Sequence, residues 1–399
     1  MRRAATLGVL GIAAAGGFGL GVVLATGGQQ PVGAVSSAGP SAAPLSSLGS
    51  AGSPISSASL APSSSPEPTA TPVPTPTTVP APLTGRLVLP QVAARHPIAV
   101  MIDDLGAARP QSGFSAASVV WQAPAEGGIP RYMLVFQENI PKAVGPVRSS
   151  RQYYIAWASE WKALYVHAGG SPQALASLRA NGRGQWVYNA DEFRWGGRYL
   201  WRATDRFAPH NVYTDGGHLR ELAKRLGAAD GPLEPAWTFA PDATRNLRPA
   251  GGTIRVDYPY ETITYRYDAT TNTYIRYING SKKPQVDRAD GNVVAPTNVV
   301  ILRMGFGPLN DGHPQKHRLE AQDVGKGVAW IATNGHTVKG QWRKASPTAP
   351  TLLYGPDGKL FTLTAGQTFV QVLALNYTYA IHDGAPPRWH PPTHMYDDE

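Results

Sequence analysis

An uncharged apolar run opens the chain. Arg2 and Arg3 precede it, and it extends from Ala4 to Thr26. About 20 apolar helical residues span the hydrocarbon core of a membrane, and flanking arginines stay on the cytoplasmic side. The pattern therefore predicts a signal-anchor helix over residues 1–27 that holds the chain to a membrane. A cleaved signal peptide is the alternative.

No regular alternation of apolar and polar positions follows in residues 28–84. This segment consists almost entirely of Ser, Pro, Ala, Gly, Thr and Val, with Glu67 as its one charged residue. Such a composition cannot bury enough apolar surface to offset the entropy lost on folding. We expect a disordered tether, extended where proline recurs, that separates the folded part from the membrane.

Short apolar runs and helical spacing alternate in residues 85–245. Strands are expected at 97–103, 119–123, 132–137 and 163–167, and helices at 150–161, 173–179 and 218–226. Alternating strands and helices are typical of layered α/β structures. The pattern predicts an α/β domain over residues 85–245.

Residues 250–375 instead alternate with a period of two. The expected strands are 253–258, 262–267, 273–278, 298–304, 327–333, 336–342 and 368–373. Asn279-Gly280 and Asn334-Gly335 are strong hairpin-turn signals. The pattern predicts a smaller, mostly antiparallel β domain, followed by a tail over residues 376–399.

Composition narrows the possible chemistry. The 399 residues include no cysteine, which excludes disulfides, thiolate zinc sites and a cysteine nucleophile. Residues 85–399 hold 34 basic and 26 acidic side chains, a net charge of +8. A basic exported domain suits anionic wall polymers or lipid head groups, and nucleic acid is not an expected partner outside the cell.

Five polar residues lie at or just after the ends of predicted strands. They are Asp103, Asp104, Arg109, Glu126 and His167. Ligands of open α/β sheets bind outside the carboxyl ends of the strands. If these strands are parallel, the five side chains converge on one site.

A glycine-rich turn connects the strand at 163–167 to the next helix. Gly169 and Gly170 permit a tight turn, Ser171 is a good N-cap, and Pro172 suits the first helical position. Ordinary capping accounts for this pattern. The alternative is an anion or oxyanion site, in which free backbone N–H groups bind the ligand.

Aromatic residues and arginines interleave between residues 185 and 213. The rings are Trp186, Tyr188, Phe193, Trp195, Tyr199, Trp201 and Phe207, and the arginines are Arg194, Arg198, Arg202 and Arg206. The tract is either an irregular core segment or a platform for sugar rings or an extended polymer. His210 and Asn211 close it and are candidate ligand-binding residues.

Two groups of histidines and carboxylates are candidate metal sites. The first is Asp311, His313 and His317 in a Gly/Pro-rich loop, and the second is His390 and His394 beside the acidic C-terminus. Neither spacing matches a zinc pattern. Solvated loop residues account for both groups, so neither a metal nor another cofactor is expected.

Six strings in order over about 120 residues resemble the YerB-like family of bacterial exported proteins, many of which are lipoproteins. The strings are PIAVMIDD (97–104), ARPQSG (108–113), EGGIPR (126–131), GPVRSSR (145–151), HAGGSPQA (167–174) and PHNVYT (209–214). The resemblance implies envelope localisation and two domains, but no settled activity. This chain lacks the lipid-attachment cysteine, so a helical anchor is expected in its place. Pro130 stands where the family more typically has threonine.

Three functions remain open. A binding protein would use Arg109, Arg131, Arg148, Arg151, His167, Gly169, Gly170, Ser171, His210 and Asn211 to hold an anionic or glycan wall polymer. A hydrolase would use Asp103 and Glu126 as paired catalytic carboxylates, about 5 to 10 Å apart, on a glycosidic or phosphodiester bond. An envelope scaffold for protein partners would use the same charges as internal salt bridges.

Overall fold

The computed structural model describes residues 77–180 and 186–385. The expected anchor (1–27), residues 28–76 of the expected tether and residues 386–399 of the expected tail lie outside these ranges. Within the described ranges, no helix combines the length and apolarity that a membrane crossing needs. The described part of the chain is mostly β.

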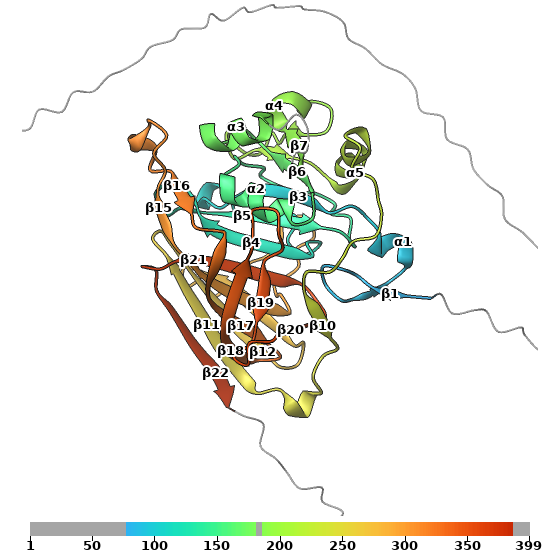
Figure 1. The fold of residues 1–399 in the computed structure, drawn as a ribbon, viewed down its shortest axis with the longest axis vertical. Coiled ribbons are helices and arrows are strands. Elements are labelled where there is room, and N and C mark those ends of the chain that lie inside the picture. Colours follow the sequence, from blue (N-terminus) through green and yellow to red (C-terminus); the bar gives the residue numbers. More distant parts are fainter. Residues whose placement is uncertain (1–76, 181–185, 386–399) are drawn as a thin grey trace, which may run out of the picture. The chain divides into compact units, whose positions relative to one another are not determined.

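One ten-stranded sheet runs through both predicted globular regions (Figure 1). Its order is β19-β18-β17-β14-β21-β4-β5-β3-β6-β7. The first region contributes β3 (Ile98–Asp103), β4 (Val119–Pro124), β5 (Pro130–Phe136), β6 (Leu164–His167) and β7 (Tyr188–Asp191). The second contributes β14 (Asn298–Met304), β17 (Gly325–Thr333), β18 (His336–Lys344), β19 (Leu352–Tyr354) and β21 (Thr368–Ala374).

The two regions meet where β21 pairs in parallel with β4. The register runs from Thr368 opposite Val119 to Gln371 opposite Gln122. Both strands are buried along their whole length, as expected of strands covered on both faces. The sheet therefore has no edge between the regions.

Helices cover one face of the first region's strands. Within the predicted helical segment 150–161, α2 (Gln152–Ser159) is buried almost throughout, and α3 (Pro172–Ala180) lies beside it. Trp157 of α2 stacks on Trp121 of β4, with ring centroids 4.7 Å apart. These aromatic contacts fix α2 against the sheet.

A second, four-stranded sheet covers the opposite face. It consists of β13 (Thr273–Ile278), β12 (Glu261–Asp268), β11 (Ala250–Tyr258) and β22 (Tyr379–Ala385), all antiparallel. Its inward side chains, such as Val256, Ile263 and Tyr265, share one core with Val120 and Leu134 of the large sheet. Leu219 and Leu222 of helix α5 (Gly216–Arg225) belong to the same core, so this face of the first region is covered by α5 as well as by the four-stranded sheet. The expected tail begins with a strand, β22.

Sequence patterns located the hairpin between β17 and β18. Asn334 (φ +51°) and Gly335 (φ +79°) form its two-residue turn, because both positions need a positive φ. The remaining helices and strands are β1 (Val79–Pro80), β2 (Leu87–Val88), α1 (Pro90–Ala93), α4 (Glu192–Trp195), β8 (Trp201–Arg202), β9 (Val212–Tyr213), α5 (Gly216–Arg225), β10 (Thr238–Ala240), β15 (Phe306–Pro308), β16 (Leu319–Ala321) and β20 (Thr362–Thr364).

Candidate functional site

One edge of the large sheet gathers most of the predicted polar residues. β3, β4, β6 and β7 run in the same direction, whereas β5 runs opposite to its neighbours β3 and β4. Asp103, Glu126 and His167 therefore lie at or just beyond carboxyl ends on this edge, and Arg131 lies there at the start of β5. We call it the carboxyl edge.

Asp103 is a buried carboxylate with two basic partners. Its Oδ2 lies 2.7 Å from Nδ1 of His210 and 2.9 Å from Nε of Arg148, and its Oδ1 accepts a hydrogen bond from the Leu105 N–H. The carboxylate is almost inaccessible, whereas the side chains of His210 and Arg148 remain 17% and 22% exposed. Asp103 thus anchors two side chains that reach solvent.

The backbone holds Arg148 beside the end of β3. The Asp103 N–H donates to the Pro146 carbonyl, and the Arg148 N–H donates to the Met101 carbonyl. Desolvation is the main cause that lowers the pKa of Arg148; Asp103 opposes it and nearby Arg131 reinforces it. In the described ranges, no protein partner is recorded for the two Nη atoms of Arg148.

Glu126 belongs to a separate ion-pair group. Its Oε2 lies 3.1 Å from Nη2 of Arg131, and its Oε1 pairs with Nη2 of Arg151. The two arginines also donate to the carbonyls of Ser149 and Ser150. Glu126 and Asp103 therefore have different basic partners, and no recorded contact joins the two proposed catalytic carboxylates.

Arg109 lies in a third group, buried between the two sheets. Its Nη2 lies 3.0 Å from Oδ1 of Asp104 and also pairs with Glu261 of β12. The amide nitrogen of Gln122 donates to the same two carboxylates, at 2.6 and 3.1 Å. The Arg109 guanidinium is therefore already paired with two buried carboxylates, although 22% of its side chain is exposed.

Arg276 completes this buried group from β13. Its guanidinium is fully buried and donates to Gln122 Oε1, Tyr132 OH and Tyr265 OH, at 2.8, 2.8 and 3.2 Å. Burial raises the pKa of Asp104 to about 6, although Arg109 and Arg276 oppose the shift. We call Asp104, Arg109, Gln122, Glu261 and Arg276 the buried polar network.

The glycine-rich turn after β6 uses its polar groups internally. Ser171 Oγ accepts from the Ala174 N–H, as an N-cap does, and the Gly169 N–H donates to Asp191. His167 is fully buried, with Nδ1 2.8 Å from the Gly169 carbonyl and Nε2 2.7 Å from Asn189 Oδ1. Gly170 pairs with Ser150 in an isolated bridge. These hydrogen bonds are all made within the protein. Anion binding by this turn stays a prediction.

The aromatic tract contributes both core and surface rings. Tyr199 is buried, whereas Phe193 and Phe207 are 79% and 92% exposed. Arg202 connects the two ends of the tract, because it donates to Glu192 Oε1 at 3.0 Å and to Asn211 Oδ1 at 3.1 Å. The buried rings agree with the core interpretation, a platform for sugar rings stays a prediction for the exposed rings, and Asn211 holds the loop together.

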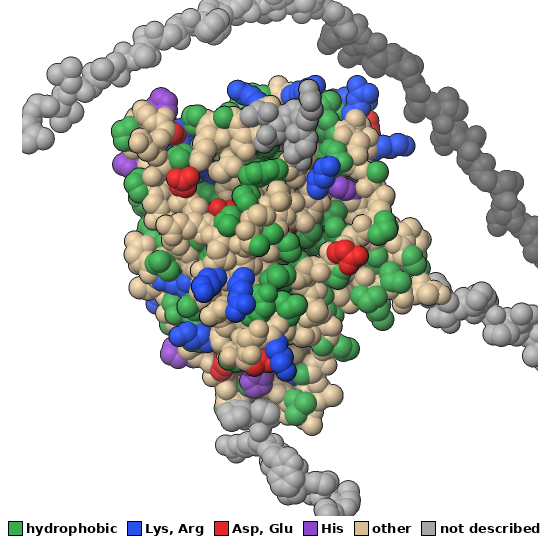
Figure 2. All heavy atoms as spheres, viewed as in Figure 1, with side chains coloured by type: hydrophobic (Ala, Val, Ile, Leu, Met, Phe, Trp, Pro, Cys, Tyr) green, Lys and Arg blue, Asp and Glu red, His purple; other side chains and the backbone are tan. Residues whose placement is uncertain are grey.

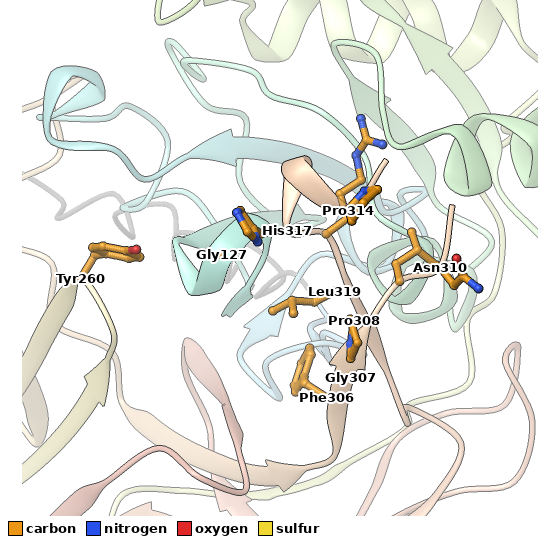
Figure 3. A pocket seen from close by; sticks show the side chains of 11 residues that line it. Gly127, Tyr260, Phe306, Gly307, Pro308, Asn310, Pro314, His317 and Leu319 are labelled. Carbon is orange, nitrogen blue, oxygen red and sulfur yellow. The ribbon is translucent and has the colours of Figure 1, made fainter. Parts of the chain in front are cut away.

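A cavity of about 820 Å³ opens beside Glu126. Figure 3 shows Phe306, Pro308 and Leu319 on one side, His317 close to Gly127, and Tyr260 further away. The Gly127 N–H donates to the His317 carbonyl at 2.8 Å, which ties the two regions together at the cavity. Its volume is within the usual range for small-molecule sites.

The loop histidines do not form a metal centre in the structure. Asp311 Oδ2 accepts a 2.5 Å hydrogen bond from Arg318, and its Oδ1 accepts from the His313 N–H. In residues 77–180 and 186–385, no three His, Asp or Glu side chains gather in a way that could hold a metal ion. His390 and His394 lie outside the described residues.

Sequence reasoning missed three members of the buried polar network. Glu261, Arg276 and Gln122 were not predicted, yet two of them carried a signal. Gln122 interrupts an apolar run on β4. Arg276 lies two residues after Tyr274 on β13, so both side chains point to the buried face of that strand. A charged or amide side chain at an inward strand position indicates a buried polar partner.

Comparisons with known proteins identify the family. Residues 83–229 match the model "Protein of unknown function (DUF3048) N-terminal domain", and residues 254–370 match the corresponding C-terminal domain. "Putative lipoprotein YerB" of Bacillus subtilis (strain 168) is 30% identical over 298 residues, 73% of this chain and 85% of the relative. The crystal structure of B. subtilis YerB matches with a TM-score of 0.66 and 26% identity, over 76% of this chain and 99% of that one. The resemblance carried by the six strings is confirmed, and the chain belongs to the YerB-like (DUF3048) family.

Proposed function

We propose that the protein is held to a bacterial membrane by its N-terminus and binds an anionic glycan or wall polymer outside the cytoplasm. The observation that carries this proposal is the guanidinium of Arg148. Its Nε forms a 2.9 Å ion pair with Asp103, while its two Nη atoms have no recorded partner in the described ranges. A positioned guanidinium with free Nη–H groups is suited to bind carboxylate or phosphate oxygens in a bidentate manner.

The other predicted arginines support a narrower site than the sequence suggested. Arg131 and Arg151 pair with Glu126, and Arg109 pairs with Asp104 and Glu261. On the face shown in Figure 2, Lys and Arg side chains lie in separate groups rather than in one continuous patch. Anion binding in this proposal therefore depends on Arg148 rather than on the overall charge.

Exposed rings lie on the segments that contact Arg148 and His210. The Phe207 carbonyl accepts from the His210 N–H. The Ala168 N–H donates to the Arg148 carbonyl, and Phe193 lies against the neighbouring Gly169. Exposed rings on segments that are hydrogen-bonded to Arg148 and His210 are suited to contact the sugar faces of a polymer that also carries negative charge.

The name of a relative and the N-terminal pattern support this location. The B. subtilis relative is named a putative lipoprotein. The present sequence has no cysteine to carry a lipid, but its residues 4–26 form an uncharged apolar run behind Arg2 and Arg3. A helical anchor and a long tether would place the described part in the envelope.

Binding can be tested with the full-length chain in detergent. We expect co-sedimentation with purified bacterial cell walls, weakened at least 10-fold by Arg148→Ala, because a hydrogen bond to a charged group contributes about 1.5–3 kcal/mol. Arg198→Ala is the matched control, since Arg198 pairs with Glu221 at the surface. Equal binding by both variants would exclude Arg148 as the binding residue, and no wall binding by the unmodified protein would overturn the proposal.

A further inference from the structure

The Asp103–His210 contact points to a reaction at the proposed binding site. The Nδ1 of His210 has Asp103 Oδ2 as its partner at 2.7 Å. A carboxylate accepts hydrogen bonds, so it favours the tautomer with the proton on Nδ1. The lone pair of neutral His210 then lies on Nε2, for which no partner is recorded in the described part of the chain. An imidazole held in this way is suited to accept a proton.

Arg148 pairs with the same carboxylate and brings a positive charge close to His210. Its Nε and the His210 Nδ1 both approach Asp103 Oδ2, at 2.9 and 2.7 Å. The two side chains are therefore neighbours, and both are partly exposed at the carboxyl edge. A proton acceptor beside fixed N–H donors is the arrangement that stabilises an oxyanion next to an attacking water.

We propose that His210 and Arg148 hydrolyse O-acyl esters on the polymer that the site binds; this inference rests on the proposed binding function. His210 Nε2 removes a proton from water while the water oxygen bonds to the ester carbonyl carbon. The carbonyl π electrons move to oxygen, and the Arg148 Nη–H groups stabilise that oxyanion. As the oxyanion collapses, the carbon–alkoxide bond breaks and His210 returns its proton to the leaving oxygen. One water is consumed, and a carboxylic acid and a polymer hydroxyl are released.

The arrangement favours an ester over the other bonds of a wall polymer. Glycoside hydrolysis needs two carboxyl groups across the bond, and Glu126 is held by Arg131 and Arg151. In-line phosphoryl transfer places the attacking and leaving oxygens on opposite sides of phosphorus. Ester hydrolysis can take and return its proton through one imidazole, as the histidine of the Ser-His-Asp triad does.

Asp103 acts in this reaction as a positioning residue. It has no access to substrate, because only 3% of its side chain is exposed. Asp103→Asn should favour the wrong imidazole tautomer and lower kcat, whereas KM should change less, because the amide oxygen can still accept from Arg148 Nε. A change of carboxylate to amide at the same position in a Ser-His-Asp triad lowers kcat by about 10⁴-fold.

A surface pair provides a matched control. His218 Nδ1 lies 2.8 Å from Asp215 Oδ2, so it is also a histidine paired with an aspartate. Its ring is more exposed, and its recorded salt bridge is to Asp215 alone. His218→Ala therefore controls for unspecific ester cleavage by surface imidazoles.

The experiment measures wall binding and acid release on the same full-length samples. Purified cell walls and 4-nitrophenyl acetate serve as probes, and released acid is quantified by chromatography. We expect His210→Ala to bind walls but lose at least 100-fold in acid release, Asp103→Asn to lose kcat, and His218→Ala to match the unmodified protein. ¹⁵N NMR of labelled histidine should show His210 protonated on Nδ1, and this signal should change in Asp103→Asn.

Each other outcome has a definite meaning. Wall binding without acid release, or equal release by His210→Ala, overturns the ester inference and leaves the binding function intact. Equal losses in His210→Ala and His218→Ala also overturn it, because they assign the activity to surface imidazoles in general. Absence of wall binding in the unmodified protein overturns the binding function itself.

Discussion

Arg276 of β13 donates a 2.8 Å hydrogen bond to the side-chain oxygen of Gln122 on β4. The two residues are 154 positions apart and belong to different predicted regions. Gln122 in turn donates to Asp104 and Glu261, so one amide connects Arg276 to both carboxylates of the buried polar network. The four-stranded sheet is therefore attached to the large sheet by ionic hydrogen bonds as well as by apolar packing.

Loss of Arg276 should destabilise the described unit strongly. Arg276→Met would remove a fully buried cation and leave Asp104 and Glu261 with Arg109 as their remaining guanidinium partner. Breaking a buried ion pair from one side costs about 3–5 kcal/mol. Urea denaturation should show this loss in the free energy of unfolding. Arg255→Met, on the exposed side of β11, should change it by less than about 1 kcal/mol, and equal effects would contradict the role of the network.

Asp104 should make stability depend on pH. Its pKa is raised to about 6 in the folded protein from 3.8, because burial disfavours the carboxylate. Between these values the folded state binds more protons than the unfolded state, so this group's contribution to stability falls as pH rises from about 4 to 6. Two pKa units correspond to a loss of about 3 kcal/mol.

The difference between the native protein and Asp104→Asn isolates this contribution. Other carboxylates titrate in both proteins, so their effects cancel in the difference between the two free energies of unfolding. We expect that difference to change between pH 4 and 6 and to be constant above about pH 7. A difference independent of pH would show that Asp104 remains ionised when buried.

Local patterns predicted strands but not their partners. The period-two segments became β11, β12 and β13, and Asn334-Gly335 formed the expected hairpin. The parallel pairing of β21 with β4 joins residues about 250 positions apart, and nothing in either apolar run specifies the other. For the same reason, the α/β pattern did not reveal that a second sheet covers one face.

The candidate site was predictable only in part. Asp103 and Glu126 end or follow apolar runs, which is why the sequence placed them at one edge. His210 and Arg148 were candidates too, but their pairing with Asp103 could not be predicted, because both come from loops whose path depends on tertiary contacts. Arg109 and Arg148 are equally exposed, at 22% of the side chain, but Arg109 pairs with two buried carboxylates, whereas Arg148 pairs with Asp103 through Nε alone.

Asp287 of the second region is hydrogen-bonded to the loop that follows the 3₁₀ turn at Gly106–Ala108. Its carboxylate accepts hydrogen bonds from the N–H groups of Gly113, Ser115 and Ala289. Asp287→Ala should leave buried donors unpaired and lower the free energy of unfolding by about 1–3 kcal/mol. Chemical denaturation measures this loss. Asp357→Ala, in an exposed turn, should leave stability almost unchanged, and similar losses in both variants would contradict the assigned role.

Gly128 determines how closely the Glu126 loop approaches the second region. Its φ is +86°, and a Cβ there would lie 2.6 Å from the hydroxyl of Tyr377 and 2.7 Å from Cγ of Pro259. Gly128→Ala should therefore displace the loop and change the shape of the cavity beside Glu126. The left-handed backbone of a non-glycine residue lowers the free energy of unfolding by a further amount of about 1–2 kcal/mol. Differential scanning calorimetry would report the lower melting temperature.

Gly197→Ala separates these two costs. Gly197 has a similar φ of +79°, but a Cβ there would meet no atom within 4 Å. This variant should bear only the backbone cost, whereas Gly128→Ala should lose more, because the overlap with Tyr377 and Pro259 forces the two regions apart. Equal losses would mean that the loop relaxes without strain, and the close approach of Gly128 would then not be needed to hold Glu126 at the carboxyl edge.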